Sequence, residues 1–405
     1  MKIGEFSKIN NISIETTRHY MDLGLIVPYK KGAQYEFNRK CQDDLTNILE
    51  LKSLGFTLNE IKSIFIYETL GKLSNEEQNG FLQDIFKLKN EEISKRIDEL
   101  KIIETKLIDK LSEINKRKIK SNFNIGVDIK KIDLLQCIDC GGKLDLEEAN
   151  IKNNQILDGS LKCLCGKRYK INSGILIVQE NLINKDSEKC KNVIENYIKE
   201  TDENHILNIR KDLNWTYNKL CDIDFKDKVI LEIGSGLGFL LRNLYDNLDS
   251  SSLYIAIDND IQKHIYLKNL IEKSNLKKNI MFICTDFKFI PIKRESVDLL
   301  LDCAGSSNYW FDKNDFSIKD ILKYLKEDSY VFLSYILFKK FSLTNSIKEE
   351  NRKNFNINYI KSKLKENNFN MISDIKSNYL NKPSIYEDYF SDNEEVYSYL
   401  FFGKR

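Results

Sequence analysis

Four features, two of them absences, set the first limits on what this chain of 405 residues does. No apolar run approaches the roughly 18 residues that a membrane-spanning helix needs, and the N-terminus lacks the pattern of a signal peptide. The charges nearly cancel, with 63 basic and 61 acidic residues, which excludes a general binder of polyanions. The nine cysteines are an odd number in a long chain, which argues against a secreted disulfide framework. We therefore expect a cytoplasmic protein without a membrane segment.

Proline and histidine are also scarce. Only three prolines occur, and Pro28 and Pro291 stand inside sequence motifs. The three histidines are His19, His205 and His264. Histidine is the most frequent general base in enzymes, so this scarcity leaves no base assignable from the sequence. At this length the chain is expected to form two to four domains, each with its own core.

The first 65 residues have the pattern of a helix-turn-helix. Asn10-Asn11 interrupts a short apolar stripe, and asparagine tolerates the positive φ of a tight turn. Ser13 is a natural N-cap for a second helix over 14–20. A short basic hairpin, or wing, is expected near residues 28–37, followed by a second pair of helices. We expect the helix after Ser13 to expose hydrogen-bonding side chains to groove edges and phosphates: Thr16, Thr17, Arg18 and Tyr20.

This segment resembles the winged helix-turn-helix domain of MerR-type transcription regulators. The matching pieces, in the order and spacing of that family, are Ile3-Gly4-Glu5-Phe6, Ser13, Thr17-Arg18-His19-Tyr20, Gly24-Leu25 with Pro28, Tyr35, and Leu54-Gly55-Phe56-Thr57-Leu58 with Glu60-Ile61. One departure is Glu36, because the family usually carries arginine there in the wing. A helix-turn-helix used only for packing is the alternative.

The MerR resemblance implies an all-α winged helix-turn-helix domain at residues 1–72. Its implied partners are double-stranded promoter DNA and, at the promoter, RNA polymerase. The residues that it implies at the DNA are Ser13, Thr16, Thr17, Arg18, Tyr20, Lys30, Lys31, Tyr35 and Arg39.

A long helix is predicted from about residue 76 to 118. Apolar side chains recur there at seven-residue steps, which is typical of a coiled-coil seam: Phe86, Ile93, Leu100, Leu107 and Ile114. Regulators of the MerR type dimerise through an antiparallel helix pair in this place. The resemblance therefore implies a homodimer, with a coiled-coil segment at 73–122 that sets two recognition helices against two half-sites. The alternative is an amphipathic helix packed on its own chain.

Four cysteines are paired on two short turns. Cys137 and Cys140 stand in Cys-Ile-Asp-Cys-Gly-Gly, and Cys163 and Cys165 stand in Cys-Leu-Cys-Gly. Four thiolates on two turns suit a tetrahedral ion, and the glycines let backbone N–H groups turn towards sulfur. The second turn has the shorter Cys-x-Cys spacing. Reduced cysteines without a metal are the alternative.

The cysteine pattern resembles the zinc ribbon that precedes the catalytic domain in a number of methyltransferases. It implies a small β domain at residues 130–182 that holds Zn²⁺. Such a site is structural, because four protein ligands leave no open position for a substrate.

A glycine-rich loop opens the last domain. A strand over 229–231 runs into Glu-Ile-Gly-Ser-Gly-Leu-Gly at 232–238, where alternating glycines let a ligand approach the backbone at a helix N-terminus. A second strand, over 253–257, ends in Asp258, whose carboxylate can accept hydrogen bonds from two ribose hydroxyls. A third strand leads to Asp286 and a fourth to Asp302. Strands separated by helical stretches predict a parallel sheet with covered faces.

Together these elements resemble class I S-adenosylmethionine-dependent methyltransferases over about residues 195–405. The resemblance implies an α/β doubly wound domain at 185–405 with a seven-stranded sheet and S-adenosyl-L-methionine as cofactor. It implies that Asp258 binds the ribose, that Asp286 and Phe287 recognise the adenine, and that Glu232 and the loop hold the methionine part. The implied cofactor residues are Glu232, Gly234, Ser235, Gly236, Gly238, Asp258, Asn259, Asp286 and Phe287.

A nicotinamide dinucleotide is the competing cofactor. Its loop reads Gly-x-Gly-x-x-Gly, whereas this loop reads Gly-x-Gly-x-Gly and has an acidic residue two places before it. That difference favours a cofactor with a cationic amino-acid end and no pyrophosphate, which is S-adenosylmethionine.

The sequence leaves the chemistry of the last domain open. The segment after the fourth strand lacks both the Asn-Pro-Pro-Tyr type of motif and a Pro-Cys pair. Asp302, Asn308 and Tyr309 are catalytic candidates by position alone. Methyl transfer needs little besides an aligned nucleophile and cofactor, so the missing base does not exclude catalysis.

Three functional readings follow from these patterns. The first is a transcription regulator whose C-terminal domain senses S-adenosylmethionine or a small molecule. The alternative is an active methyltransferase of an unknown small molecule that also regulates a promoter. The third is a nucleic-acid methyltransferase that uses the N-terminal domain for targeting. The sequence identifies neither the methyl acceptor nor the direction of regulation.

Overall fold

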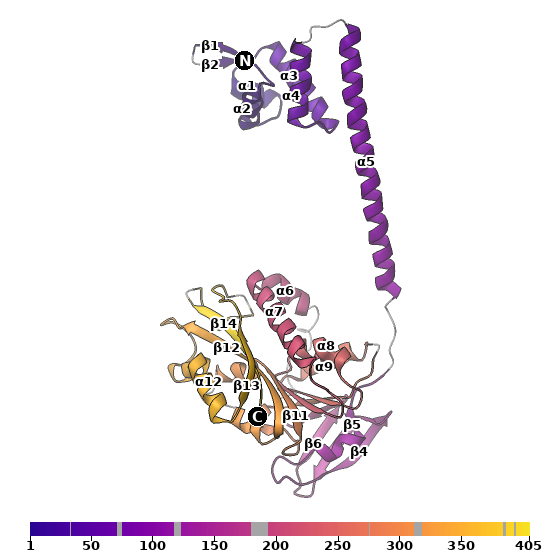
Figure 1. Cartoon of the computed structure of the whole chain (residues 1–405), viewed down its shortest axis with the longest axis vertical. Helices are drawn as coiled ribbons and strands as arrows, with labels where there is room; N and C mark the ends of the chain where they lie inside the picture. The colour runs from indigo at the N-terminus through magenta and orange to yellow at the C-terminus, as the bar shows by residue number, and fades with distance from the viewer. Residues whose placement is uncertain are drawn as a thin grey trace. The chain divides into compact units, whose positions relative to one another are not determined.

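The computed structural model describes residues 1–32, 34–70, 75–116, 123–179, 193–274, 276–311, 318–383, 386–392 and 394–405. The chain divides into two compact units, Met1–Lys118 and Ile119–Arg405 (Figure 1). The expected domain boundaries near 72, 122 and 185 lie beside or within residues outside these ranges. Within the described residues, no helix combines the length and apolarity that crossing a membrane requires.

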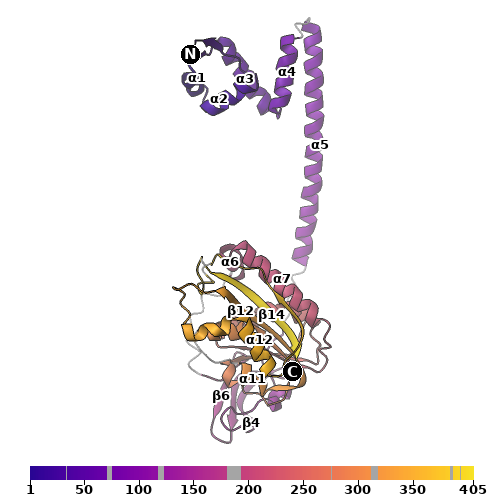
Figure 2. The same ribbon diagram turned by 60° about the vertical axis from the view of Figure 1, so that its left-hand side comes forward.

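The first unit is a winged helix-turn-helix followed by one long helix (Figure 2). Asn11 has a φ of +53° in the turn, and the Ser13 hydroxyl accepts a hydrogen bond from the Thr16 N–H at 2.9 Å, as the N-cap prediction requires. The wing is an antiparallel hairpin. The elements are α1 (Ile3–Ile9), α2 (Ile14–Asp22), β1 (Tyr29–Lys31), β2 (Gln34–Glu36), α3 (Arg39–Ser53), α4 (Leu58–Leu70) and α5 (Asn75–Lys116).

Two of the side chains expected on the surface of α2 are buried instead. Thr17 is 0 % exposed, and its hydroxyl lies 2.8 Å from that of Ser7. Tyr20 is 2 % exposed within the core of the unit, and its hydroxyl accepts a hydrogen bond from Lys52 at 3.3 Å. The prediction that both are exposed was wrong, because positions 17 and 20 lie three residues apart and therefore face the same side of the helix. That side packs against α1 and α3.

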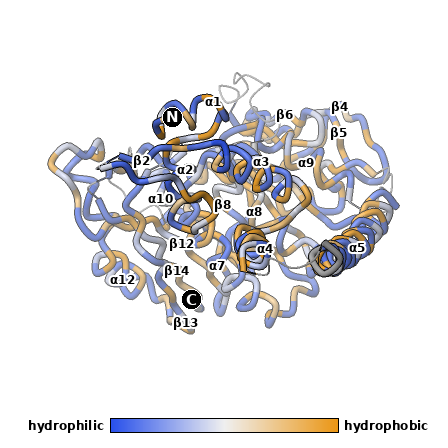
Figure 3. The backbone as a smooth tube through the Cα atoms, turned by 90° about the horizontal axis from the view of Figure 1, so that it is seen from above, coloured by the Kyte–Doolittle hydropathy of each residue, from blue (hydrophilic) through white to orange (hydrophobic). Residues whose placement is uncertain are grey.

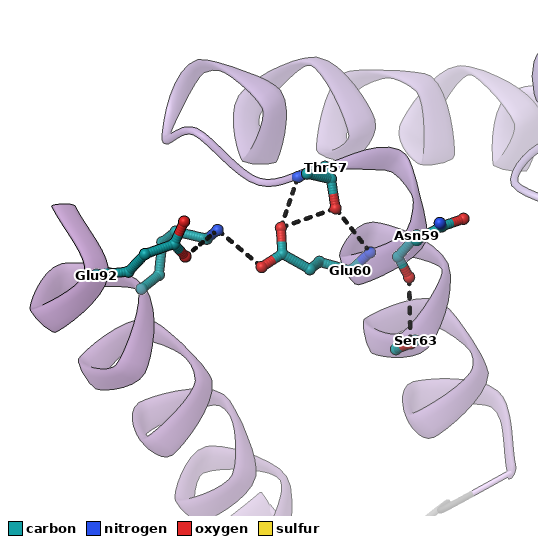
Figure 4. A network of polar contacts seen from close by, with 6 residues as sticks. Thr57, Asn59, Glu60, Ser63 and Glu92 are labelled. Carbon is teal, nitrogen blue, oxygen red and sulfur yellow. Dashed lines mark hydrogen bonds and ion pairs between the residues drawn. The ribbon is translucent and has the colours of Figure 1, made fainter. Parts of the chain in front are cut away.

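A polar network joins α4 to α5 (Figure 4). Glu60 accepts hydrogen bonds from the Thr57 N–H at 2.7 Å and from the Thr57 hydroxyl at 2.9 Å. The Thr57 hydroxyl in turn accepts one from the Glu60 N–H, which completes a capping box at the start of α4. Lys89 of α5 lies 2.7 Å from Glu60 and 2.7 Å from Glu92. The long helix is thus tied to the helix-turn-helix by a lysine that is only 7 % exposed.

In the described residues of the second unit, the strands form one twelve-stranded sheet. Seven of its strands run in the order β10-β9-β8-β11-β12-β14-β13, and β14 is antiparallel to both of its neighbours. Their bounds are β8 (Val229–Ile233), β9 (Leu253–Asp258), β10 (Ile280–Cys284), β11 (Val297–Cys303), β12 (Leu325–Lys340), β13 (Asn370–Lys376) and β14 (Glu395–Lys404). The expected seven-stranded sheet is therefore present.

Helices cover both faces of this sheet, and each face has its own apolar core. One core holds side chains of α7 (Glu203–Leu220), α8 (Phe239–Leu244) and α9 (Ile261–Ile271). The other holds side chains of α10 (Gly305–Trp310), α11 (Ile318–Leu322) and α12 (Ile357–Glu366). A further helix, α6 (Val193–Glu200), precedes α7. Figure 3 shows hydrophobic residues along β8, as expected for a strand covered on both sides.

The cysteine-bearing segment continues the same sheet. Its last strand, β7 (Ile175–Ile177), pairs in parallel with β10, with Ile175 opposite Phe282. All three residues of β7 are buried. A strand that is apolar on both faces is stabilised most when both faces are covered. The segment expected as a small β domain is thus hydrogen-bonded into the sheet of the last domain. Its other strands are β3 (Val127–Asp128), β4 (Leu144–Lys152), β5 (Gln155–Cys163) and β6 (Arg168–Asn172).

Candidate cofactor site, cysteine cluster and DNA-binding surface

The glycine loop follows β8 and has a close neighbour on each side. Gly234 has a φ of +66°, and a Cβ atom there would lie 2.6 Å from the Cα of Gly305, the first residue of α10. At Gly238 a Cβ atom would lie 2.4 Å from the Leu267 side chain of α9. A side chain at Gly234 would push the loop away from the start of α10, and one at Gly238 would collide with α9, so these glycines let the loop lie close to both helices.

Asp258 holds the loop from the neighbouring strand. Its carboxylate accepts hydrogen bonds from the Gly236 N–H at 2.8 Å and from the Asp260 N–H at 2.9 Å. The side chain is 7 % exposed and borders a cavity. The ends of β8 and β9 are therefore fixed relative to each other, with one carboxylate at the cavity wall.

That cavity encloses about 350 Å³ at the carboxyl ends of the parallel strands. This is the edge at which open α/β sheets bind their ligands. Six of the expected cofactor residues line it: Gly234, Gly236, Asp258, Asn259, Asp286 and Phe287. Lys263, Thr285, Asn308 and Tyr309 line it as well, and of these Lys263 and Thr285 were not predicted as site residues.

An aromatic pair closes one side of this cavity. The rings of Phe287 and Tyr309 meet edge to face, with centroids 4.8 Å apart. The Lys288 ammonium lies 5.1 Å from the centre of the Tyr309 ring, and the backbone N–H of Lys288 donates to the Asp286 carboxylate at 2.9 Å. A flat heteroaromatic ring can stack on one of these rings.

The remaining three expected cofactor residues, Glu232, Ser235 and Gly238, do not line the cavity. Glu232 is 1 % exposed, and one of its carboxylate oxygens has no hydrogen-bond partner. Burial raises the pKa of Glu232 to about 8. The Ser235 hydroxyl is likewise buried without a partner. A buried polar group without a hydrogen-bond partner costs free energy of folding. Both groups could therefore form hydrogen bonds with a ligand that reaches beneath the glycine loop.

The three positional candidates for catalysis have different surroundings. Asp302 is 0 % exposed and accepts a hydrogen bond from the Ser306 N–H at 3.1 Å. Burial raises the pKa of Asp302 to about 6, and this residue lines neither the cofactor cavity nor its neighbour. Tyr309 lines the cofactor cavity, and Asn308 lines both cavities. Access to a ligand thus favours Asn308 and Tyr309 over Asp302.

The neighbouring cavity, of about 310 Å³, was not foreseen from the sequence. Its walls come from segments far apart in the chain, among them α6, α7, β11, β12, β14 and the stretch around Glu387. Asn308 belongs to both cavities. No sequence pattern links residues near 200 with residues near 390, so only the fold reveals this site.

The four cysteines of the two turns come together. The sulfur atoms of Cys137, Cys140, Cys163 and Cys165 all lie within 4.8 Å of one another. Cys137 Sγ lies 3.6 Å from Cys165 Sγ, and Cys140 Sγ lies 3.4 Å from Cys163 Sγ. A tetrahedral ion with Zn–S bonds of about 2.3 Å separates its sulfur ligands by roughly 3.8 Å, so the cluster has nearly the size that zinc requires.

Hydrogen bonds to the cysteine sulfurs orient the cluster. The Tyr169 hydroxyl donates to Cys137 Sγ at 3.4 Å, and the Gly142 N–H donates to Cys140 Sγ at 3.4 Å. A Cβ atom at Gly142 would lie 3.1 Å from Cys163 Sγ, so glycine leaves room for the sulfurs. Donors of this kind stabilise thiolates and orient metal ligands.

The helix-turn-helix presents a polar surface at its expected DNA-binding residues. Arg18 of α2 is exposed, as are Lys30, Lys31 and Tyr35 of the wing. Ser13 and Arg39 are exposed and Thr16 is half-buried. Lys31 lies 4.0 Å from Glu36, the position where the MerR pattern has arginine. An exposed pair of this kind is weak, so the wing keeps a lysine that can reach a phosphate.

Comparison with known proteins finds a matching family for part of each unit. Residues 1–67 match the MerR HTH family regulatory proteins, and residues 224–398 match a methyltransferase domain. The ZntR homologue of Haemophilus influenzae, an HTH-type transcriptional regulator, is 35% identical over 111 residues, which are 27% of this chain and 79% of that protein. The mercuric resistance operon regulatory protein of Bacillus cereus is also 35% identical over 111 residues, covering 27% of this chain and 80% of that protein.

Among solved structures, phosphoethanolamine N-methyltransferase 2 of Haemonchus contortus aligns with a TM-score of 0.35 and 16% identity. The alignment covers 48% of this chain and 52% of that enzyme, so the chain spans about half of its length. The helix-turn-helix, the long helix and the matches over about four fifths of two regulators agree with one another. The chain belongs to the MerR family of HTH regulatory proteins, and it carries a methyltransferase domain behind its regulator segment.

Proposed function

We propose that the protein is a promoter-binding regulator whose C-terminal domain binds S-adenosyl-L-methionine as an effector. One observation carries this proposal: the glycine loop, Asp258 and Asp286 border a single cavity on a chain that begins with a MerR segment. Such a domain would let a ligand control the promoter. For this, the ligand must bind the protein's conformations with unequal affinity.

The residues at the cavity fit this cofactor. The carboxylate of Asp258 is positioned to accept ribose hydroxyls, and the Phe287–Tyr309 wall with Asp286 suits a purine. Glu232 and Ser235 lie outside the lining of the cavity, and their unpartnered buried oxygens would meet a cationic amino-acid end that reaches beneath the glycine loop. When bound, the cofactor supplies an electrophilic methyl group. The protein's own residues bind, orient and shield it.

The cysteine cluster is proposed as a structural zinc site. The sulfur separations and the donors from Tyr169 and Gly142 support this assignment. The strands that carry the cysteines continue into β7, the neighbour of β10. A metal at this place would therefore stabilise one edge of the sheet on which the cofactor cavity is built.

Dimeric binding to DNA is the second part of the regulatory proposal. In the single chain the apolar positions of α5 are exposed at seven-residue steps: Phe86 39%, Ile93 40%, Leu100 57%, Leu107 60% and Ile114 52%. A stripe of this kind is stabilised by a second copy of the same helix. Two copies would present two α2 helices to a near-palindromic operator, where RNA polymerase is a further expected partner.

An active methyltransferase that also regulates its promoter is the alternative. The observation that favours it is Asn308, which borders both the cofactor cavity and the neighbouring one. A small molecule in the second cavity would thus lie next to the cofactor. A small molecule sensed together with S-adenosylmethionine and a methyl acceptor would then occupy the same place, and the two functions differ only in whether the methyl group is transferred.

Calorimetric binding of S-adenosylmethionine to the purified chain tests the proposal, with NADH as the competing ligand. Asp258→Ala is expected to weaken S-adenosylmethionine binding by about 1–3 kcal/mol, since it removes a buried acceptor. Asp246→Ala, an exposed carboxylate of the same domain, serves as the matched control. Binding of NADH in place of S-adenosylmethionine, or equal affinity of the Asp258 variant, would refute the choice of cofactor.

A further inference from the structure

The cavity beside the cofactor site is aromatic, and its ionisable groups are mainly acidic. Six of its lining residues carry aromatic rings: Tyr197, Phe239, Phe332, Tyr386, Tyr389 and Tyr397. Two carboxylates, those of Asp212 and Glu387, stand among these rings. Among the described residues that line it, none is a lysine or an arginine, and His205 is the one ionisable base. Carboxylates surrounded by aromatic faces make an environment suited to a cation.

Glu387 is the more deeply buried of the two acids. Its side chain is 5 % exposed, and its carboxylate accepts a hydrogen bond from the Tyr197 hydroxyl at 2.8 Å. His205 Nδ1 lies 3.5 Å from the same oxygen. Burial, followed by the charge of Glu387, raises the pKa of Tyr197 above its usual range. Tyr197 therefore keeps its proton and acts as a donor, which orients the carboxylate in the cavity wall.

The second acid lies on α7. Asp212 lines the cavity from the helix that also carries His205. Burial raises the pKa of Asp212 to about 6. Taking a carboxylate out of water is costly unless a positive group compensates for the loss of hydration. A bound ammonium would provide that compensation for Asp212 and would lie beside the carboxylate of Glu387, whereas a bound anion would be repelled by both acids.

The size of the cavity limits the ligand to a compact molecule. About 310 Å³ is at the lower end of the range for small-molecule sites. The ring of Tyr197 packs against that of Tyr386 with centroids 5.1 Å apart, so α6 and the segment after residue 385 form one aromatic wall. An apolar body carrying one charged nitrogen would satisfy both the rings and the carboxylates.

We propose that this cavity binds a compact organic amine in its protonated form, with the ammonium at Glu387 and Asp212 and the apolar body against the tyrosine rings. The proposal rests on the proposed function in one respect, namely that the adjoining cavity holds the cofactor, so that the amine is its effector or methyl acceptor. Recognition of the amine itself depends only on residues of this chain.

Calorimetry with three probes of one shape tests the inference on the full chain: 2-phenylethylamine, 2-phenylethanol and 3-phenylpropionate. The amine should bind at least about tenfold more tightly than the alcohol, and the carboxylate should bind weakest, because charge is the main difference between the probes. Equal binding of amine and alcohol, tighter binding of the carboxylate, or no binding of the amine at millimolar concentration would overturn it.

Three variants localise the effect. Glu387→Gln and Asp212→Asn should each weaken the amine by about tenfold and leave the alcohol nearly unchanged. Glu203→Gln, an exposed acid at the start of α7, should leave both probes unchanged. Retained far-ultraviolet circular dichroism shows that each variant is folded. Amine affinity that survives both substitutions at the cavity contradicts the assignment.

S-adenosylmethionine binding, measured on the same samples, separates this inference from the proposed function. If the amine binds as expected and S-adenosylmethionine does not, the cofactor proposal fails and the cation site stands. If S-adenosylmethionine binds and the charge preference is absent, the cation site fails and the cofactor proposal stands.

Discussion

Lys89 of α5 lies 2.7 Å from Glu60 of α4, and the lysine is only 7 % exposed. Glu60 is also the residue that caps α4 through Thr57. Hydrogen bonds to Glu60 and Glu92 raise the pKa of Lys89, and the hydrogen bond from Lys89 lowers the pKa of Glu60. Both groups are thus charged at neutral pH, and one ion pair joins the DNA-binding helices to the helix expected to form the dimer.

Lys89→Met should weaken operator binding by roughly three- to tenfold, because the helix-turn-helix would no longer be held against α5, the helix expected to form the dimer. Lys101→Met is the matched control, since Lys101 lies on the same helix and pairs with Asp98 in an exposed position. Fluorescence anisotropy with an operator selected from random sequence measures the affinity. An unchanged operator affinity of the Lys89 variant would show that the Lys89–Glu60 pair does not fix the orientation of the helix-turn-helix relative to α5.

Arg18→Ala should reduce operator affinity at all salt concentrations and make the salt dependence shallower, by about one unit of slope if Arg18 contacts one phosphate. The side chain is exposed on α2. Titrations between low and moderate salt give the slope. Arg96→Ala, an exposed position of α5, should leave the slope as it is. A slope that stays the same in the Arg18 variant would place the contact elsewhere.

Metal content tests the cysteine cluster. Protein purified without added metal should contain one zinc ion per chain, and the double variant Cys140→Ser/Cys165→Ser should contain almost none. Loss of a structural metal also lowers the thermal midpoint of the second unit. Cys221→Ser is the control, because Cys221 is exposed and lies outside the cluster. Equal zinc content in all three samples would contradict the assignment of the four cysteines as a zinc site.

Glu232 should make the second unit less stable as the pH rises. Burial raises its pKa from 4.5 to about 8, so between these values the folded state holds a proton that the unfolded state has released. The free energy of unfolding therefore falls as the pH rises from about 4.5 to about 8. Glu232→Gln should flatten this fall in the free energy of unfolding. The difference should be clearest between about pH 6.5 and 8.5, because the buried Asp302, with its pKa of about 6, contributes little further change there.

Thermal denaturation at several pH values gives the comparison for Glu232. Glu366→Gln, an exposed acid in α12, provides the control. Parallel curves for wild type and the Glu232 variant would show that the buried carboxyl group does not titrate in this range.

The sequence predicted local structure well where a short pattern determines it. Ser13 caps α2, and the strands before Asp258 and Asp286 end where expected, because capping and buried apolar runs are local properties. The exposure of Thr17 and Tyr20 was mispredicted because it depends on which side of α2 meets α1 and α3. Neither the Lys89–Glu60 pair nor the aromatic cavity has a sequence pattern, since each joins residues brought together only by folding.

Coupling between the two ends of the chain is the central claim, and transcription with operator occupancy read in the same reactions tests it most directly. Saturating S-adenosylmethionine, alone and with 2-phenylethylamine, should change operator affinity by about 5- to 150-fold, or change transcript output at constant occupancy. The ligands must be shown by calorimetry to be bound under the same conditions. If both are bound and neither occupancy nor transcript output responds, the two units are only tethered, and the account of a ligand-controlled regulator is contradicted.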